Sequence, residues 1–148
     1  MNLKISNSQI TYIRKANLYL ISLTFLTFII GLYFSLLGSP PDYVQGESMR
    51  IMYIHVPSAW LSLFSYTILA ASCVAWFVYR NPTFNLIAKS IAPIGAVLTL
   101  IALVTGSIWG KPTWGVWWVW DARLTSMLIL FFLYLAYILL WQSISNQE

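Results

Sequence analysis

The stretch WGKPTWGVWWVWDAR, residues 109–123, separates two long apolar runs. It holds five of the protein's eight tryptophans, together with Lys111, Asp121 and Arg123. A polar break between two apolar runs of membrane-spanning length is expected at a membrane surface. The dense group of indoles beside fixed charges predicts a surface that binds a flat, apolar, anionic ligand.

The composition is that of an integral membrane protein. The 148 residues are 59% hydrophobic and 8% charged, and the mean hydropathy is +0.75, whereas soluble domains carry roughly 25% charged residues. The formal net charge of +4 comes from scattered residues without a basic run, which argues against a nucleic-acid partner. The single cysteine, Cys73, excludes a disulfide within the chain and a CxxC redox pair.

The apolar runs predict an all-α fold, a bundle of four transmembrane helices in one membrane domain over residues 1–148. Each run approaches the roughly 20 residues that cross the hydrocarbon core. The first is expected to be a retained anchor, since a signal peptide has a shorter apolar region. Pro57 is expected in the first turn of the second helix. The predicted spans are about 18–37, 58–79, 90–109 and 124–141, and the predicted outer loops are 38–57 and 110–123.

Small residues recur every three or four positions along the third predicted helix. Such a stripe lets neighbouring helices approach closely in a membrane. We therefore expect other helices to pack closely against this one. The stripe comprises Ala88, Ala92, Gly95, Thr99, Ala102 and Gly106.

The basic residues predict the orientation, because lysine and arginine favour the cytoplasmic side. With the N-terminus inside, five would be cytoplasmic: Lys4, Arg14, Lys15, Arg80 and Lys89. Three would be outside: Arg50, Lys111 and Arg123. This bias favours a cytoplasmic N-terminus, and the loop before His55 and the tryptophan-rich stretch then share the outer face.

His55 is the only histidine and a candidate iron ligand. It lies two residues before Pro57, at the positive end of a predicted helix, where the dipole disfavours the imidazolium form. Neutral imidazole is the form that coordinates metals. One histidine cannot hold a bare zinc ion, but it can hold haem iron, to which the porphyrin supplies four nitrogens. A structural, hydrogen-bonded histidine is the alternative.

The conformation and the role of the tryptophan-rich stretch stay open. In a helix Trp114, Trp117, Trp118 and Asp121 would share one face, whereas in an extended chain Trp114, Trp118 and Trp120 would do so; an interfacial amphipathic helix is favoured. Interfacial anchoring could also explain the indoles. Asp121 could cap the fourth helix, and Arg123 could extend to the headgroup region. If haem binds, Arg50, Lys111 or Arg123 could pair with its propionates.

The motif Trp114-Gly-x-x-Trp118-x-Trp120-Asp121 resembles the tryptophan-rich WWD signature of haem-handling membrane proteins. Its context looks like the haem exporter protein C (CcmC) family of the cytochrome c maturation system. Further matches are Arg50-x-x-Tyr-x-His-Val-Pro57, Ala92-Pro-Ile-Gly-Ala96 and Ala102-Leu-Val-Thr-Gly-Ser107. The resemblance extends from about residue 38 to the end of the fourth predicted helix.

The resemblance implies haem binding and delivery at the outer face of a bacterial inner membrane, or less favourably of a mitochondrial one, for c-type cytochrome biogenesis. Haem would be a transient cargo, presented to the haem chaperone CcmE with the small subunit CcmD and the ATP-binding cassette pair CcmA and CcmB. No enzymatic activity is expected, because no catalytic constellation is visible. His55 would be the axial ligand of haem iron. The predicted cofactor-binding residues are His55, Trp114, Trp117, Trp118, Trp120, Asp121, Arg50 and Arg123.

The chain departs from the family pattern in one respect. Family members resemble proteins with six spans and a second axial histidine, whereas four spans and only His55 are expected here. A partner or a second copy could supply the other ligand. The alternative function is that of a truncated or degenerate membrane subunit, which docks partners without binding haem.

Overall fold

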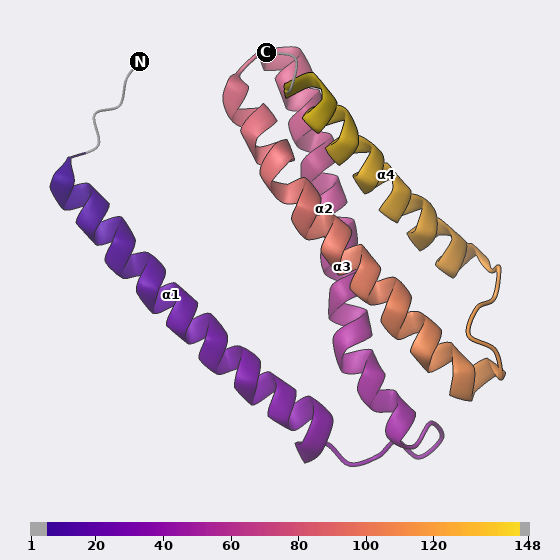
Figure 1. Cartoon of the computed structure of the whole chain (residues 1–148). Helices are drawn as coiled ribbons and strands as arrows, with labels where there is room; N and C mark the ends of the chain where they lie inside the picture. The colour runs from indigo at the N-terminus through magenta and orange to yellow at the C-terminus, as the bar shows by residue number, and fades with distance from the viewer. Residues whose placement is uncertain (1–5, 146–148) are drawn as a thin grey trace. The chain divides into compact units, whose positions relative to one another are not determined.

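The computed structural model describes residues 6–145, and four α-helices make up most of this range (Figure 1). The helices are α1 (Asn7–Tyr33), α2 (Met52–Tyr79), α3 (Pro82–Trp114) and α4 (Ala122–Ser145). All four are long and apolar enough to cross a membrane, which confirms the predicted fold class. The chain divides into two units, one containing α1 and the other containing α2, α3 and α4. Lys4, which was counted for the orientation, lies outside the described residues.

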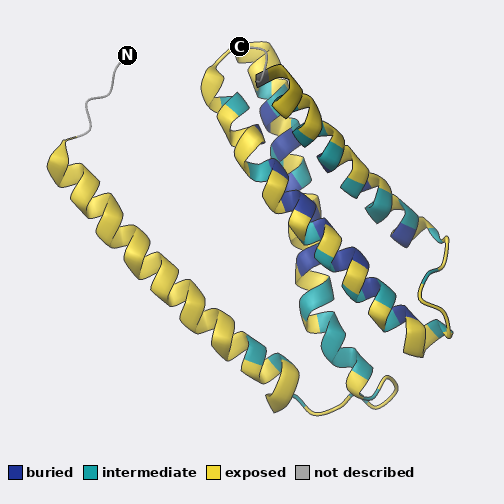
Figure 2. Ribbon diagram, viewed as in Figure 1, coloured by how far each residue is buried: buried dark blue, intermediate teal, exposed yellow. Residues whose placement is uncertain are grey.

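Helix α1 begins earlier than the predicted span because its polar first turn is capped. The Ser6 hydroxyl accepts a hydrogen bond from the Gln9 backbone N–H, and the Gln9 side chain accepts one from the Ser6 backbone N–H. These reciprocal bonds satisfy two donors at the helix start. A π-helical turn, Phe34–Gly38, continues α1. No residue of α1 is buried within its own unit (Figure 2).

Helices α2 and α3 pack closely because their facing side chains are small. The whole predicted stripe on α3 is buried, with Thr99 completely enclosed, which confirms its role in packing. The partner face on α2 is a row of serines that the sequence reasoning did not identify. The buried residues of α2 are Ser58, Ser62, Ser65, Leu69 and Ser72.

Tyr134 of α4 joins all three helices of this unit. Its side chain is fully buried, its hydroxyl donates to the Ser62 carbonyl of α2 at 2.8 Å, and its ring stacks edge-on against Tyr66. The ring lies directly on Gly95 of α3, where a Cβ atom would come within 2.2 Å of it. Gly95 is therefore the space into which the aromatic ring of α4 fits.

Two local predictions were wrong. Helix α2 begins at Met52 after a 3₁₀ turn (Glu47–Ile51), so Pro57 lies inside the helix rather than in its first turn. The tryptophan-rich stretch does not form an interfacial helix of its own. Helix α3 instead continues to Trp114 and ends at Gly115, whose φ of 77° favours glycine, and residues 115–121 are irregular.

Candidate functional site

His55 lies in the first turn of α2 and faces the last third of α3. Its Nδ1 atom is 3.0 Å from the Ala102 carbonyl oxygen and 3.1 Å from the Thr105 hydroxyl oxygen. The Thr105 hydroxyl itself donates to the Ile101 carbonyl at 2.6 Å. Because a carbonyl only accepts, Nδ1 carries the hydrogen in the neutral ring. The lone pair is then on Nε2, the arrangement in which a histidine ligates a metal.

Gly106 allows the imidazole to lie against α3. A Cβ atom at this position would be 3.0 Å from His55 Cε1 and 3.4 Å from Nδ1. A larger side chain would therefore push the ring away from the Ala102 carbonyl. The small-residue stripe thus has two uses: it packs α3 against its neighbours, and at Gly106 it makes room for the histidine.

A cavity of about 100 Å³ opens beside His55. It brings together three of the eight predicted binding residues, namely His55, Trp114 and Arg123. The other five do not line it: Arg50, Trp117, Trp118, Trp120 and Asp121. The remaining lining residues are Ala102, Leu103, Gly106, Trp109, Leu124 and Met127.

Arg123 connects the cavity to the start of α4. Its guanidinium lies 5.5 Å from the ring centroid of Trp114 and donates to Asp121 Oδ2 at 2.7 Å. The other Asp121 oxygen accepts from the Leu124 backbone N–H at 2.9 Å, so Asp121 caps α4 as one reading of the sequence expected. The pKa of Asp121 is lowered from its ordinary value. The main cause is the hydrogen bond from the Leu124 N–H, and the second is the hydrogen bond from the Arg123 side chain.

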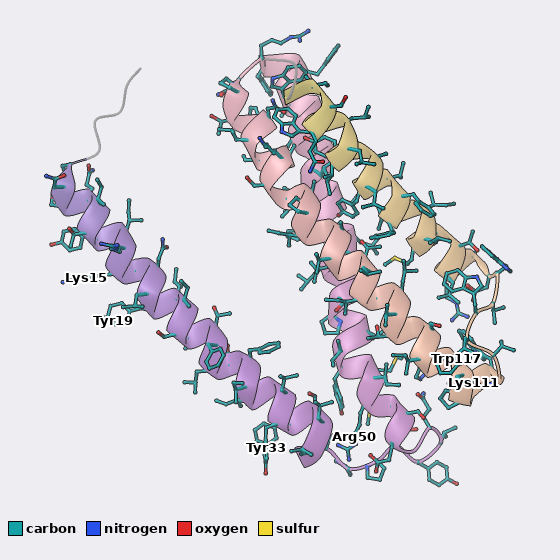
Figure 3. The ribbon with its side chains drawn as sticks, viewed as in Figure 1. Lys15, Tyr19, Tyr33, Arg50, Lys111 and Trp117 are labelled. Carbon is teal, nitrogen blue, oxygen red and sulfur yellow. The ribbon has the colours of Figure 1, made fainter. Side chains whose placement is uncertain are left out.

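The tryptophans form two separate pairs. The rings of Trp109 and Trp114 meet edge to face with centroids 5.2 Å apart, and those of Trp118 and Trp120 do so at 5.5 Å. Only the first pair lines the cavity. Trp117 is exposed near the end of α3 (Figure 3), and its carbonyl accepts a hydrogen bond from the Ser107 hydroxyl.

The loop before α2 also attaches to this end of α3. Asp42 and Gly46 exchange two backbone hydrogen bonds in a tight turn, and Asp42 accepts from the Val44 and Gln45 N–H groups. The Gln45 side chain then accepts a hydrogen bond from Trp109 Nε1 at 2.9 Å. The loop before α2 and the end of α3 therefore meet at one end of the three-helix unit, which we call the His55 end.

The predicted propionate partners are already engaged. Arg50, at the start of α2 (Figure 3), forms an ion pair with Glu47. Arg123 is paired with Asp121, and Lys111 donates to the Gly115 carbonyl at the end of α3. Any acidic ligand group would have to compete with these partners.

The donor set suits haem iron better than a bare ion. Across residues 6–145 no group of three or more histidine, cysteine, aspartate or glutamate side chains could hold a metal ion. A single imidazole is sufficient only where a macrocycle supplies the other nitrogens. His55, with its Nδ1 hydrogen committed and indoles nearby, fits that requirement.

Comparison with known proteins identifies the family. The model of the heme exporter protein C family (CcmC) matches residues 2–148. The chain belongs to the haem exporter protein C family. It is 48% identical over 128 residues to heme exporter protein C of Bradyrhizobium diazoefficiens, covering 86% of this chain and 48% of the relative.

Further relatives of this haem exporter family come from bacteria and from a plant. Heme exporter protein C of Escherichia coli K12 is 52% identical over 110 residues, 74% of this chain and 45% of the relative. A ccmC-like mitochondrial protein of Marchantia polymorpha is 54% identical over 111 residues, 75% of this chain and 48% of the relative. The chain thus spans about half the length of the curated relatives it matches, and it is a multi-pass membrane protein of their family.

Several residues that line the cavity beside His55 were not predicted from the sequence of this haem exporter family member. Gly106 and Trp109 lie one helical turn apart on the face of α3 that also carries Ala102. Leu124 and Met127 are likewise one turn apart on α4. Spacing of three or four residues on both sides of the tryptophan-rich stretch was the signal that could have found them.

Proposed function

We propose that the protein binds haem through His55 and presents it for c-type cytochrome biogenesis. The observation that carries this proposal is the hydrogen bond from His55 Nδ1–H to the Ala102 carbonyl, which leaves Nε2 able to ligate iron. Among the described residues, Nε2 has no hydrogen-bonding partner. Ligand binding and hand-over, without bond-making catalysis, is the chemistry that this site supports.

The residues around His55 would contact different parts of a bound macrocycle. Haem supplies an iron with open axial positions, and the indoles of Trp109 and Trp114 supply flat apolar surfaces beside His55. The cavity of about 100 Å³ is smaller than the roughly 300–1,000 Å³ of sites that enclose a ligand. Trp114 and Arg123 must therefore move apart to admit a macrocycle, and the 77% exposure of the Arg123 side chain permits this movement.

Arg123 is the favoured partner for a haem propionate. Among the predicted basic partners, it alone lines the cavity. A propionate could replace the Asp121 carboxylate in a charge-assisted hydrogen bond with the guanidinium. Asp121 would then keep its second role, the cap at the start of α4.

Family membership supports a proposal for the wider role. We place the site at the outer face of a bacterial inner membrane, with the N-terminus in the cytoplasm and a mitochondrial membrane as the second option. The partners would be a CcmE-like chaperone that receives haem, a CcmD-like small subunit, and a CcmA/CcmB-like ATP-binding cassette pair. A second axial histidine would come from a partner or a second copy, since His55 is the only histidine of this sequence.

The visible absorption spectrum of the detergent-purified protein from haem-replete cells tests this function. We expect a Soret band in the wild type that is lost in His55→Ala and restored to that variant by added imidazole. Trp60→Ala is the control, because Trp60 is 72% exposed on the same helix and should leave the band unchanged. An identical band in wild type and His55→Ala would refute axial ligation by His55.

A docking subunit that does not bind haem is the second candidate. Trp117 and Trp120 favour it, because they are 56% and 75% exposed and do not line the cavity. Large exposed aromatic side chains are typical anchors of interfaces. This function predicts no Soret band in any variant, together with loss of partner co-purification in Trp117→Ala and Trp120→Ala.

A further inference from the structure

A second cavity lies at the other end of the three-helix unit. It holds about 620 Å³, within the range of ligand-binding sites, and is far larger than the one at His55. It is formed by the last turns of α2, the first turns of α3 and the last turns of α4, so we call this region the Trp141 end. Its lining is mostly aromatic and aliphatic: Cys73, Trp76, Phe77, Asn85, Ala88, Tyr137, Trp141 and Ile144.

Two cations lie against the rings that line this cavity. The Arg80 guanidinium is 5.4 Å from the ring centroid of Trp76 and 5.0 Å from that of Phe77. The Lys89 ammonium is 4.8 Å from the ring centroid of Trp141. A cation above a ring keeps N–H groups free to bind an anion, since only one side of the cation faces the ring.

The Trp141 end carries no compensating negative charge in the described part of the chain. The acidic residues of the described range are Asp42, Glu47 and Asp121. All three lie at the His55 end, just before α2 or α4. The two ion pairs of residues 6–145 are Arg50 with Glu47 and Arg123 with Asp121. Arg80 and Lys89 therefore have no carboxylate partner among residues 6–145, which favours an anionic ligand.

An unsatisfied donor points to the same kind of ligand. The Trp141 indole N–H is buried and has no acceptor among the described residues, although the residue lines the cavity. Buried donors in native proteins are normally hydrogen-bonded. An ester or phosphate oxygen of a bound molecule would provide the missing acceptor, and the Asn85 side-chain amide lies in the same lining.

We propose that the cavity at the Trp141 end binds an anionic phospholipid. The apolar lining between helices that cross the membrane accepts acyl chain, while Arg80 and Lys89 bind the phosphate. Basic pockets between transmembrane helices are known to recognise anionic lipid headgroups. In the orientation proposed above, this end faces the inner leaflet. The site uses none of the residues around His55, so it does not depend on haem binding.

Native mass spectrometry of the full chain in detergent tests the proposal, with added phosphatidylglycerol or phosphatidylcholine. We expect phosphatidylglycerol to bind at least tenfold more tightly than phosphatidylcholine. Arg80→Gln and Lys89→Gln should each remove most of this preference. Trp141→Phe keeps the ring but removes the N–H, and it should weaken retention of both lipids. Lys111→Gln is the charge-matched control at the His55 end and should bind as the wild type does.

Several results would overturn the proposal. Equal binding of the two lipids, or the same phosphatidylglycerol binding in Arg80→Gln, Lys89→Gln and Lys111→Gln, would show that the cavity does not recognise an anionic headgroup. Retention of haem in place of lipid, with a Soret band that depends on Trp141 in a His55→Ala background, would assign the cavity to another ligand. Added phosphatidylglycerol should also raise the melting temperature of the wild type more than that of Arg80→Gln. This measurement tests whether the lipid binds the folded protein.

Discussion

At the scale of single residues, the candidate site depends on how α3 holds one imidazole ring. His55 could be singled out from the sequence because it is the only histidine and precedes a proline near a predicted helix start. Its partners could not, since Ala102 and Thr105 are 47 and 50 positions away along the chain. Only helix packing brings these groups together, and no local pattern records that contact.

Gly106→Val should weaken haem binding without removing the ligand. The new side chain would occupy the space of His55 Cε1, which lies 3.0 Å from a Cβ at this position. The ring would then lose its hydrogen bond to Ala102. Loss of such an orienting bond typically costs roughly 10- to 100-fold in affinity, which haem titration of the purified protein measures. Gly31→Val is the matched control, because a Cβ at Gly31 meets nothing within 4 Å of it; equal affinities in the two variants would contradict the prediction.

Asp121 should make the start of α4 sensitive to acid only at low pH. Its pKa is lowered in the folded protein, first by the Leu124 N–H and then by Arg123. A carboxyl with a depressed folded-state pKa stabilises the fold above its unfolded-state pKa, and this contribution disappears as the pH falls through the folded-state value. The melting temperature should therefore stay constant from neutral pH down to the ordinary aspartate range and then fall.

Two substitutions separate the roles of this carboxylate. Asn is about as good a helix cap as Asp but carries no charge, whereas Ala lacks both properties. We expect Asp121→Ala to melt at a lower temperature than Asp121→Asn at neutral pH, and both to lose the acid-dependent step. An acid transition that persists unchanged in Asp121→Asn would assign it to another group.

At the scale of helices, the residue periodicity predicted which face of α3 packs against its neighbours, but it did not predict where the helix ends. The stripe from Ala88 to Gly106 was readable because small residues repeat with helical spacing, and the structure buries all of it. The irregular path after Gly115 was not readable. It results from the end of α3 at that glycine and from the Ser107 bond to the Trp117 carbonyl, a contact ten residues apart.

The contact of Tyr134 with Gly95 should be the most sensitive point of helix packing. Gly95→Ala would place a methyl group 2.2 Å from the ring, and overpacking of this kind typically costs about 1–3 kcal/mol. Tyr134→Phe would keep the ring but lose the bond to the Ser62 carbonyl, at about 0.6 kcal/mol for a typical interhelical hydrogen bond in a membrane. Unfolding by sodium dodecyl sulfate in mixed micelles measures both. A Gly95→Ala protein as stable as Gly31→Ala would show that α4 packs differently.

At the scale of the whole molecule, the described charges separate between the two ends of the three-helix unit. Arg50, Lys111 and Arg123 lie at the His55 end, where two of them pair with acids. Arg80 and Lys89 lie at the Trp141 end, and neither has an acidic partner within the part of the chain that the structure describes. Basic residues near span ends favour the cytoplasm. Since the N-terminal Arg14 and Lys15 precede a first crossing, single crossings by all four helices would place them on the same side as Arg80.

This charge separation gives a direct prediction about orientation. In a Cys73→Ser background, which removes the only cysteine, Tyr43→Cys would report on the His55 end and Thr83→Cys on the Trp141 end. Tyr43 is fully exposed in the turn before α2, and Thr83 is exposed in the first turn of α3. A maleimide that cannot cross the inner membrane should label Tyr43→Cys in intact cells, and Thr83→Cys only after that membrane is opened. The reverse pattern would put His55 at the cytoplasmic face, where haem could be collected but not presented outside. Labelling of both positions in intact cells would instead mean that α2 does not cross the membrane, which its 28 helical residues and apolar sequence make physically unfavourable.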